Sequence, residues 1–180
     1  MKGLLMLNWQ RVVGTLILAI STLTFSQATF AAGEAAPAKT FGAWKGVCSD
    51  VKAKEGNTIK LCQVLHEVRA QNEKKTLVGL LGISKKDDAY IASVLTPLFA
   101  VLPQGVGLQI DASEKGFGGP YQLCTPAGCQ ATLALSPEVI GQLKAGNEVK
   151  ILYVDARRGA VAIPASLSGI TAAIKWLDAN

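Results

Sequence analysis

The sequence is poor in the residues that build metal and redox centres. It has one histidine, His66, and four cysteines among 180 residues. Zinc sites need three or four preorganised ligands, and their cysteine pairs are usually two residues apart. Here thirteen residues separate Cys48 from Cys62 and four separate Cys124 from Cys129. Neither gap fits zinc, and neither fits the Cys-x-x-Cys of a redox-active helix start, so we expect no metal and no redox cofactor.

Motifs of the common enzyme classes are also absent. There is no Gly-x-Ser-x-Gly elbow, no phosphate-binding loop and no metalloprotease motif. A Ser-His-Asp triad could use only His66, which strand register places with Cys62 and Val64, so we expect a packed or edge-strand histidine. The glycine-rich segment 116–119 lacks a surrounding strand-to-helix transition and is interpreted as a flexible turn. We therefore predict no catalytic residue and no bound cofactor.

Charge is sparse, at 17% of residues, with a net charge of +5. The clearest cationic features are three short pairs, at 74–75, 85–86 and 157–158. Nucleic-acid binding favours a continuous basic stripe with interleaved aromatic residues, so we interpret these pairs as solvated turns and expect no nucleic-acid partner. Weak attraction to an anionic membrane or glycolipid surface is a separate hypothesis.

The N-terminus has the order of a secretory signal peptide. Lys2 and Arg11 precede the apolar run 12–25, small residues follow, and no acidic residue occurs before Glu34. The run is short for a membrane-spanning helix, so we predict cleavage near 31–33. No cysteine lies there to carry a lipid anchor. We expect a protein of the periplasm, cell surface or exterior, with no stable membrane insertion after cleavage.

These features define a simple domain plan. Residues 1–32 are the predicted signal peptide, 33–39 a flexible Ala/Pro/Glu lead-in, and 40–180 one disulfide-stabilised domain. Cleavage would lower the basic count from 18 to 16 against 13 acidic residues, leaving a net charge near +3.

Short apolar or alternating runs, separated by Gly, Pro, Asn and Asp, dominate this domain. Such runs are typical of an antiparallel β-sandwich or barrel. In 106–111, Val106, Leu108 and Ile110 share one face, whereas 148–155 has apolar residues on both faces and is expected to be buried on both. The expected strands are 41–48, 59–69, 76–83, 89–95, 106–111, 120–124, 129–135, 148–155 and 160–167.

Two segments have helical signals instead. Segment 136–146 begins with Ser136 as an N-cap and Pro137 in the first turn and ends near Gly146, which predicts a short crossover helix. Segment 168–179 has apolar residues at helical spacing and predicts a C-terminal helix that covers an end or edge of the sandwich.

The oxidising compartment predicted from the N-terminus favours disulfides for all four cysteines. Four cysteines allow three connectivities. We favour local pairs, Cys48 with Cys62 and Cys124 with Cys129. Cys48 ends one expected strand and Cys62 begins the next, and the other two cysteines flank a turn. A crossed pairing would instead join two hairpins on facing sheets, as inter-sheet bridges do in antibody domains.

The sequence also resembles a known family, the invasion-associated locus B family of bacterial exported proteins. The resemblance rests on FGAWKGVC (41–48) with the following Cys62, on 97–111, on the CTPAGCQATLAL stretch beginning at Cys124, and on 161–177. It implies an immunoglobulin-like β-sandwich, export, and a link to host-cell invasion in some members. It supplies no catalytic residues.

Three functions follow as hypotheses. The first is an exported, non-catalytic protein that binds an envelope or host component not identified by the sequence. The second is a periplasmic folding or envelope-stress factor, which would need an exposed apolar groove or open sheet edge. The third is an unrecognised hydrolase, which would need a deep pocket beside His66. Neither the oligomeric state nor the partner is predicted.

Overall fold

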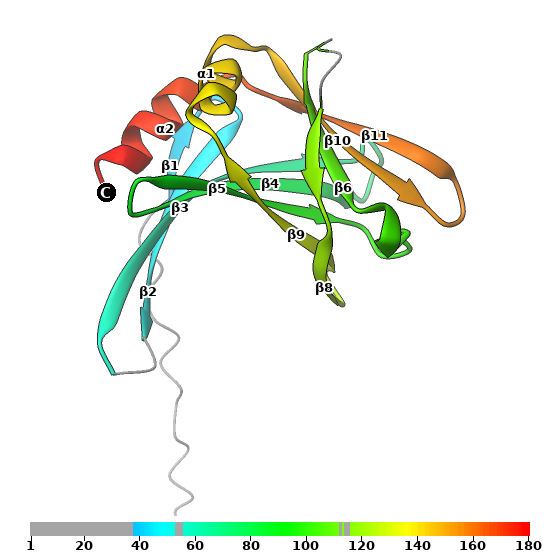
Figure 1. The fold of residues 1–180 in the computed structure, drawn as a ribbon, viewed down its shortest axis with the longest axis horizontal. Coiled ribbons are helices and arrows are strands. Elements are labelled where there is room, and N and C mark those ends of the chain that lie inside the picture. Colours follow the sequence, from blue (N-terminus) through cyan, green and yellow to red (C-terminus); the bar gives the residue numbers. More distant parts are fainter. Residues whose placement is uncertain (1–37, 53–55, 112, 114–115) are drawn as a thin grey trace, which may run out of the picture. The chain divides into compact units, whose positions relative to one another are not determined.

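The computed structural model describes residues 38–52, 56–111, 113 and 116–180. The expected signal peptide and the part of the lead-in at 33–37 lie outside this range. Two sheets with antiparallel pairing form the described part of the chain (Figure 1). The sheets and helices confirm the predicted β-sandwich with a crossover helix and a C-terminal helix.

The larger sheet has seven strands, and most neighbours in it are also neighbours in sequence. In spatial order these are β1 (Lys39–Phe41), β2 (Trp44–Lys52), β3 (Thr58–Arg69), β4 (Leu77–Lys86), β5 (Ala89–Thr96), β9 (Gly128–Leu135) and β8 (Tyr121–Thr125). The smaller sheet has the order β11 (Gly159–Ser166), β10 (Glu148–Asp155), β6 (Val106–Ile110) and β7 (Phe117–Gly119). A 3₁₀ turn, η1 (Leu102–Gln104), precedes β6.

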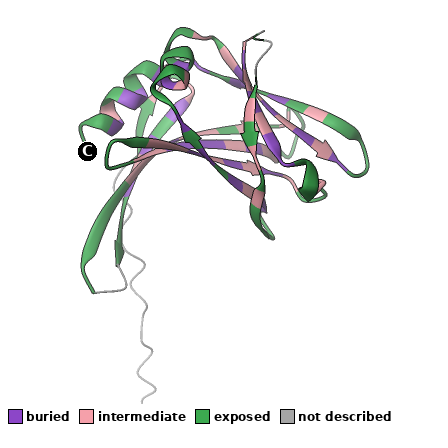
Figure 2. Ribbon diagram, viewed as in Figure 1, coloured by how far each residue is buried: buried purple, intermediate pink, exposed green. Residues whose placement is uncertain are grey.

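The core lies between the sheets because alternate residues of each strand point inward. Figure 2 shows buried residues alternating with more exposed ones along the strands. In β6, Val106, Leu108 and Ile110 are buried as predicted. Facing them from the larger sheet are Val64, Leu81, Ile83, Ala92, Val94, Ala131 and Leu133.

The two helices form where the capping signals predict them. In α1 (Pro137–Ala145) the Ser136 hydroxyl accepts a hydrogen bond from the Val139 N–H at 3.3 Å. The apolar face of α2 (Ile170–Asp178) is buried and packs against strands at the β1–β4 side of the larger sheet. Its Trp176 ring lies directly over Gly46, where an added Cβ would come within 2.6 Å of the ring. A residue with a Cβ would therefore have to displace the Trp176 ring.

Three local expectations were wrong. Segment 116–119 is not simply a turn, because 117–119 pairs with β6 as the edge strand β7. In β10, Leu152 and Val154 are only half-buried, because that face of the strand turns away from the core. The expected strand 41–48 is divided between β1 and β2 by a turn at 42–43.

Candidate binding surface

His66 is half-buried and links the two sheets. Its Nδ1 is 2.8 Å from the Ala43 carbonyl oxygen, and its Nε2 accepts the Ser166 N–H at 3.1 Å. Trp44, whose ring centroid is 5.5 Å from that of His66, donates its indole N–H to the Ser166 carbonyl at 3.1 Å. Two side chains of the larger sheet therefore hold one backbone residue of β11.

This geometry requires a neutral imidazole. Nδ1 carries the proton that Ala43 accepts, so Nε2 keeps the lone pair that Ser166 needs. Burial lowers the pKa of His66 below 6.5, and the hydrogen bond to Ala43 only partly opposes that shift. Both ring nitrogens are occupied by backbone groups, so His66 has a structural part in this fold.

The cysteines form the two local disulfides, Cys48–Cys62 and Cys124–Cys129. In each, the two residues are direct cross-strand partners with Cα atoms 4.0 Å apart. Each bond therefore joins neighbouring strands of the larger sheet, and the structure shows neither crossed pairing.

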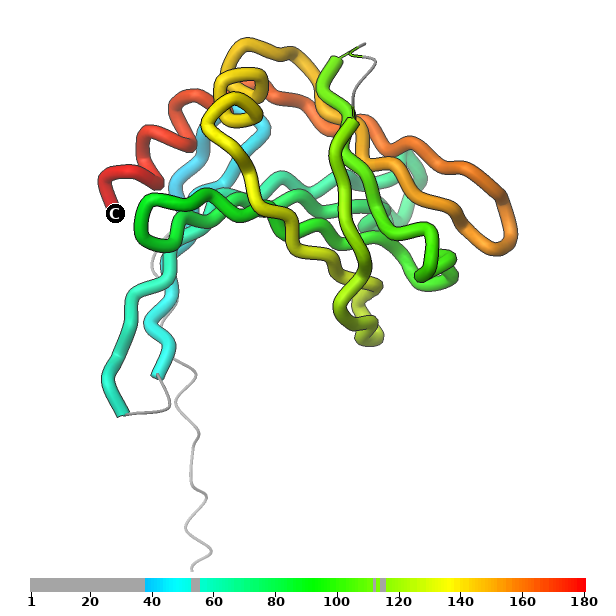
Figure 3. Tube along the Cα trace, in the orientation of Figure 1, coloured from blue at the N-terminus to red at the C-terminus, as the bar shows by residue number. Residues whose placement is uncertain are grey.

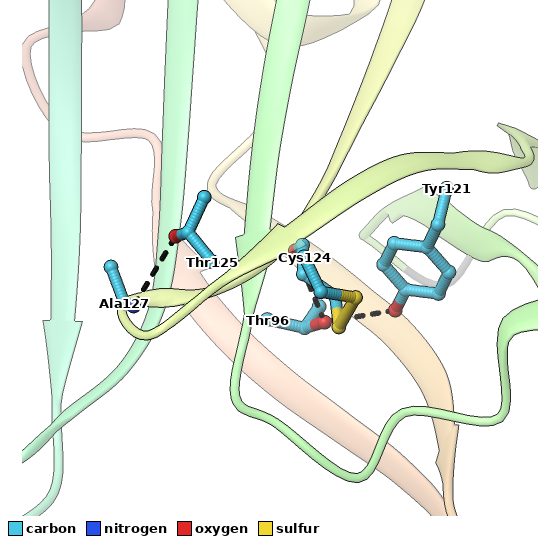
Figure 4. Close-up of a disulfide and its surroundings, with 6 residues drawn as sticks. Thr96, Tyr121, Cys124, Thr125 and Ala127 are labelled. Atoms are coloured by element: carbon cyan, nitrogen blue, oxygen red, sulfur yellow. Dashed lines mark hydrogen bonds between the residues drawn. A yellow bond between two sulfur atoms is a disulfide. The ribbon is translucent and has the colours of Figure 1, made fainter.

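Figure 4 shows the Cys124 disulfide at the base of the β8–β9 turn. The Tyr121 and Thr96 hydroxyls lie 2.9 Å apart beside it, and the Thr125 hydroxyl accepts the Ala127 N–H at 3.2 Å. Burial of the Tyr121 phenol raises its pKa, with the Thr96 bond opposing. These contacts fix a tight hairpin and bring no nucleophile and base together.

The part of the chain that the structure describes holds no group of three or more His, Cys, Asp or Glu residues placed to bind a metal. Its helices are also too short or too polar to cross a membrane.

Three of the exposed large apolar residues of the larger sheet lie on the hairpin of β2 and β3. Beyond the Cys48–Cys62 bond, the described hairpin residues are all exposed, and we call residues 49–52 and 56–61 the arm. Val51, Ile59 and Leu61 are 43%, 49% and 53% exposed. Register places Val51 opposite Ile59, so these side chains share the face that turns away from the core. Figure 1 shows the arm extending from the sheet.

The arm also has an open edge. β1 pairs with β2 only as far as Gly46, so the stretch from Val47 to Lys52 has a strand partner on one side only among the described residues. An exposed strand edge offers unpaired N–H and C=O groups in a row. A partner strand could add there.

Next to the arm, the outer face of the larger sheet is hollowed. One hollow of about 700 Å³ is lined by Ile59, Leu61 and Ile91 among others. A second, of about 220 Å³, is lined by Leu65, Leu80 and Leu95 with polar neighbours. His66 lines neither hollow. Leu61 and Leu65 lie on the same face of β3, so this half-apolar surface continues from the arm onto the sheet.

Sequence reasoning missed this surface. The apolar residues Ile59, Leu61 and Leu65 are visible at alternate positions in the sequence, but each of them could equally belong to the core. The sequence does show that β3 has apolar residues on both faces. Whether another part of the protein covers the outer face depends on the tertiary structure.

Comparisons with known proteins agree with this architecture. The family model described as "Invasion associated locus B (IalB) protein" matches residues 44–178. "Invasion protein B" of Bartonella bacilliformis (strain ATCC 35685 / KC583 / Herrer 020/F12,63) is 26% identical over 156 residues, covering 84% of this chain and 80% of the relative. The crystal structure of invasion associated protein B from Bartonella henselae superposes with a TM-score of 0.69 at 21% identity, covering 80% of this chain and 96% of the other, and supports the fold. The resemblance seen in the sequence is confirmed: the chain belongs to the invasion-associated locus B family.

Proposed function

We propose that this chain is an exported, non-catalytic binding protein that captures a protein of the cell envelope or of a host through the arm. The observation that carries the proposal is the disulfide-clamped hairpin with three half-exposed apolar side chains. Contiguous exposed apolar surface marks interaction sites in folded proteins. In addition, the only imidazole is engaged with backbone groups on both ring nitrogens, which supports binding without catalysis.

The two disulfides support export to the periplasm or the cell surface, because such bonds persist in oxidising compartments. The name of the Bartonella bacilliformis relative, "Invasion protein B", supports a role in host-cell invasion. We extend that role to this chain as part of the proposal.

A photo-crosslinking experiment tests the arm. A photoreactive residue at position 61 is compared with one at position 123, because Leu61 and Leu123 are both about half exposed and lie on different strands. Envelope and host-membrane extracts are mixed with each protein, and crosslinked partners are identified by mass spectrometry. We expect one discrete, saturable partner at position 61. Excess unlabelled protein carrying Leu123→Ser should compete this crosslink away, whereas protein carrying Leu61→Ser should compete less well. Equal crosslinking at both positions, or none at position 61, would contradict the proposal.

A folding or envelope-stress factor is the second candidate, and the open edge of β2 favours it. A client strand could pair with the stretch from Val47 to Lys52 by β-augmentation. The same experiment separates the two functions. Many unrelated partners at position 61, displaced by any unfolded protein, would support the folding factor, whereas a single saturable partner supports the binding protein.

A further inference from the structure

A second surface lies at the end of the sandwich where the β5–β6 connection (97–105) meets the β10–β11 turn (156–158). The Ala156 N–H donates to the Phe99 carbonyl at 2.8 Å, and the Val101 N–H donates to the Val154 carbonyl at 2.8 Å. A small cavity lined by Leu77, Pro97 and Ala127 among others brings the start of β4 and the β8–β9 turn to the same end. The β3–β4 turn (70–76) leads into Leu77, so it also lies here (Figure 3).

The β5–β6 connection holds three large apolar side chains out toward solvent. Leu98, Phe99 and Leu102 are 42%, 56% and 48% exposed. Phe99 also has a φ of +76°, a backbone conformation that residues with a Cβ rarely adopt. The backbone bonds to the β10–β11 turn hold it there. An exposed phenylalanine in a costly conformation is a reason to look for a function.

Two pairs of cations lie at the same end of the sandwich as these apolar residues. The Arg157 guanidinium lies over the Phe99 ring, 3.7 Å from its centroid, and Arg158 follows on the same turn. The β3–β4 turn adds Lys74 and Lys75, both exposed. Two pairs that are more than 80 residues apart in sequence therefore lie at one end of the sandwich, because both turns connect strands there.

Two carboxylates belong to the same loops, and they do not cancel the cations. Asp155 is buried and stabilises the β10–β11 turn, because its Oδ1 accepts the Arg157 backbone N–H at 2.8 Å. This hydrogen bond is the main cause of the lowered pKa of Asp155. The two arginine side chains lie 3.4 and 3.9 Å from its Oδ2. Glu73 is exposed beside Lys74. The four cations therefore outnumber the two carboxylates of these loops by two.

We propose that this loop end docks on an anionic lipid bilayer, with Leu98, Phe99 and Leu102 entering the interfacial region and the four cations binding lipid phosphates. Aromatic and aliphatic side chains beside cations suit this interface, where apolar burial and charge attraction act together. A bilayer fits this surface better than a groove-binding partner does, because the apolar side chains lie on one connection and the cations lie on two other turns. This inference is independent of the arm.

Vesicle binding of the purified exported protein tests the proposal. We expect binding to phosphatidylglycerol–phosphatidylcholine vesicles that weakens with salt, and little binding to pure phosphatidylcholine. Lys74→Gln with Lys75→Gln should reduce binding on the order of 25-fold, from about fivefold for each cation. Leu98→Ser with Leu102→Ser should also weaken it. The matched control, Lys144→Gln with Lys175→Gln, removes the same charge from α1 and α2 and should bind as the parent protein does.

A depth measurement gives a second readout that charge alone does not produce. With Phe99→Trp, lipids brominated in their acyl chains should quench the new fluorophore, whereas Ile59→Trp on the arm should not be quenched above the parent protein. Three results would overturn the proposal: no binding to anionic vesicles, an equal loss in the helix control, or quenching at position 59 but not at 99. Binding of a protein at this end without vesicle binding would overturn it as well.

Discussion

The imidazole of His66 contacts a backbone carbonyl through one nitrogen and a backbone N–H through the other. Protonation would place an N–H at Nε2 against the Ser166 N–H and remove that bond between the sheets. The only titrating group of the chain with a reference pKa near 6.5 is therefore a structural element that prefers to be neutral.

This preference predicts how stability depends on pH. Because the pKa of His66 is lower in the folded state, the unfolded state binds more protons below about pH 6.5. The free energy of unfolding should therefore be full above that pH and fall as the pH drops below it. Urea titrations between pH 8 and pH 5 measure this change. His66→Gln, which keeps a donor and an acceptor, should remove it while leaving partner binding intact, and a folded but inactive variant would revive the hydrolase hypothesis.

At the scale of elements, the arm and the helix α2 are stabilised in different ways. The arm has little packing beyond Cys48–Cys62, so the disulfide replaces a core there. The helix α2, in contrast, depends on packing and needs the space above Gly46.

Removal of the arm disulfide should lower global stability and loosen the arm. In the chain-entropy model, Cys48→Ala with Cys62→Ala should lower the free energy of unfolding by about 3 kcal/mol, because the unfolded chain gains freedom. Urea unfolding of the variant and the parent protein measures this loss. Amide hydrogen exchange should also accelerate in peptides covering the arm, and unchanged exchange there would contradict a clamp. Non-reducing peptide mapping of the parent protein should recover only the pairs Cys48–Cys62 and Cys124–Cys129.

Two glycine substitutions should have opposite signs. Gly141 lies within α1 with open space around it, so Gly141→Ala should stabilise the protein by about 0.5–1 kcal/mol through helix propensity. Gly46→Ala should destabilise it by about 1–3 kcal/mol, because the new methyl group must displace the Trp176 ring. Thermal unfolding of both variants measures the difference. Similar effects at the two sites would mean that Trp176 moves freely.

At the scale of the whole molecule, the proposals place the partner-binding arm and the lipid-binding loops on different strands and turns of one domain. Both require the chain to reach an envelope or an exterior surface. Export is therefore the condition on which both functions depend.

Intact mass spectrometry of the protein recovered from its native host tests export. The mature chain should lack about 31 to 33 N-terminal residues, because the predicted leader ends in small residues there. Recovery in the periplasmic or surface fraction should accompany this mass. A chain that retains Met1 in the inner membrane would contradict the prediction. Four free thiols would contradict the predicted oxidising compartment.

The sequence by itself determined most of the strands and both helices, because alternation, turn residues and capping groups act between positions close in the chain. Ser136 caps α1 and Val106, Leu108 and Ile110 face the core for this reason. It also favoured the local cysteine pairs that the structure contains. Only the tertiary structure decided the pairing of β7, the uncovered side of β10 and the open edge of β2. The tertiary structure alone placed Phe99 beside Arg157. The physical reason is that side-chain direction along a strand is set locally, whereas burial and neighbourhood depend on which distant segment covers each face.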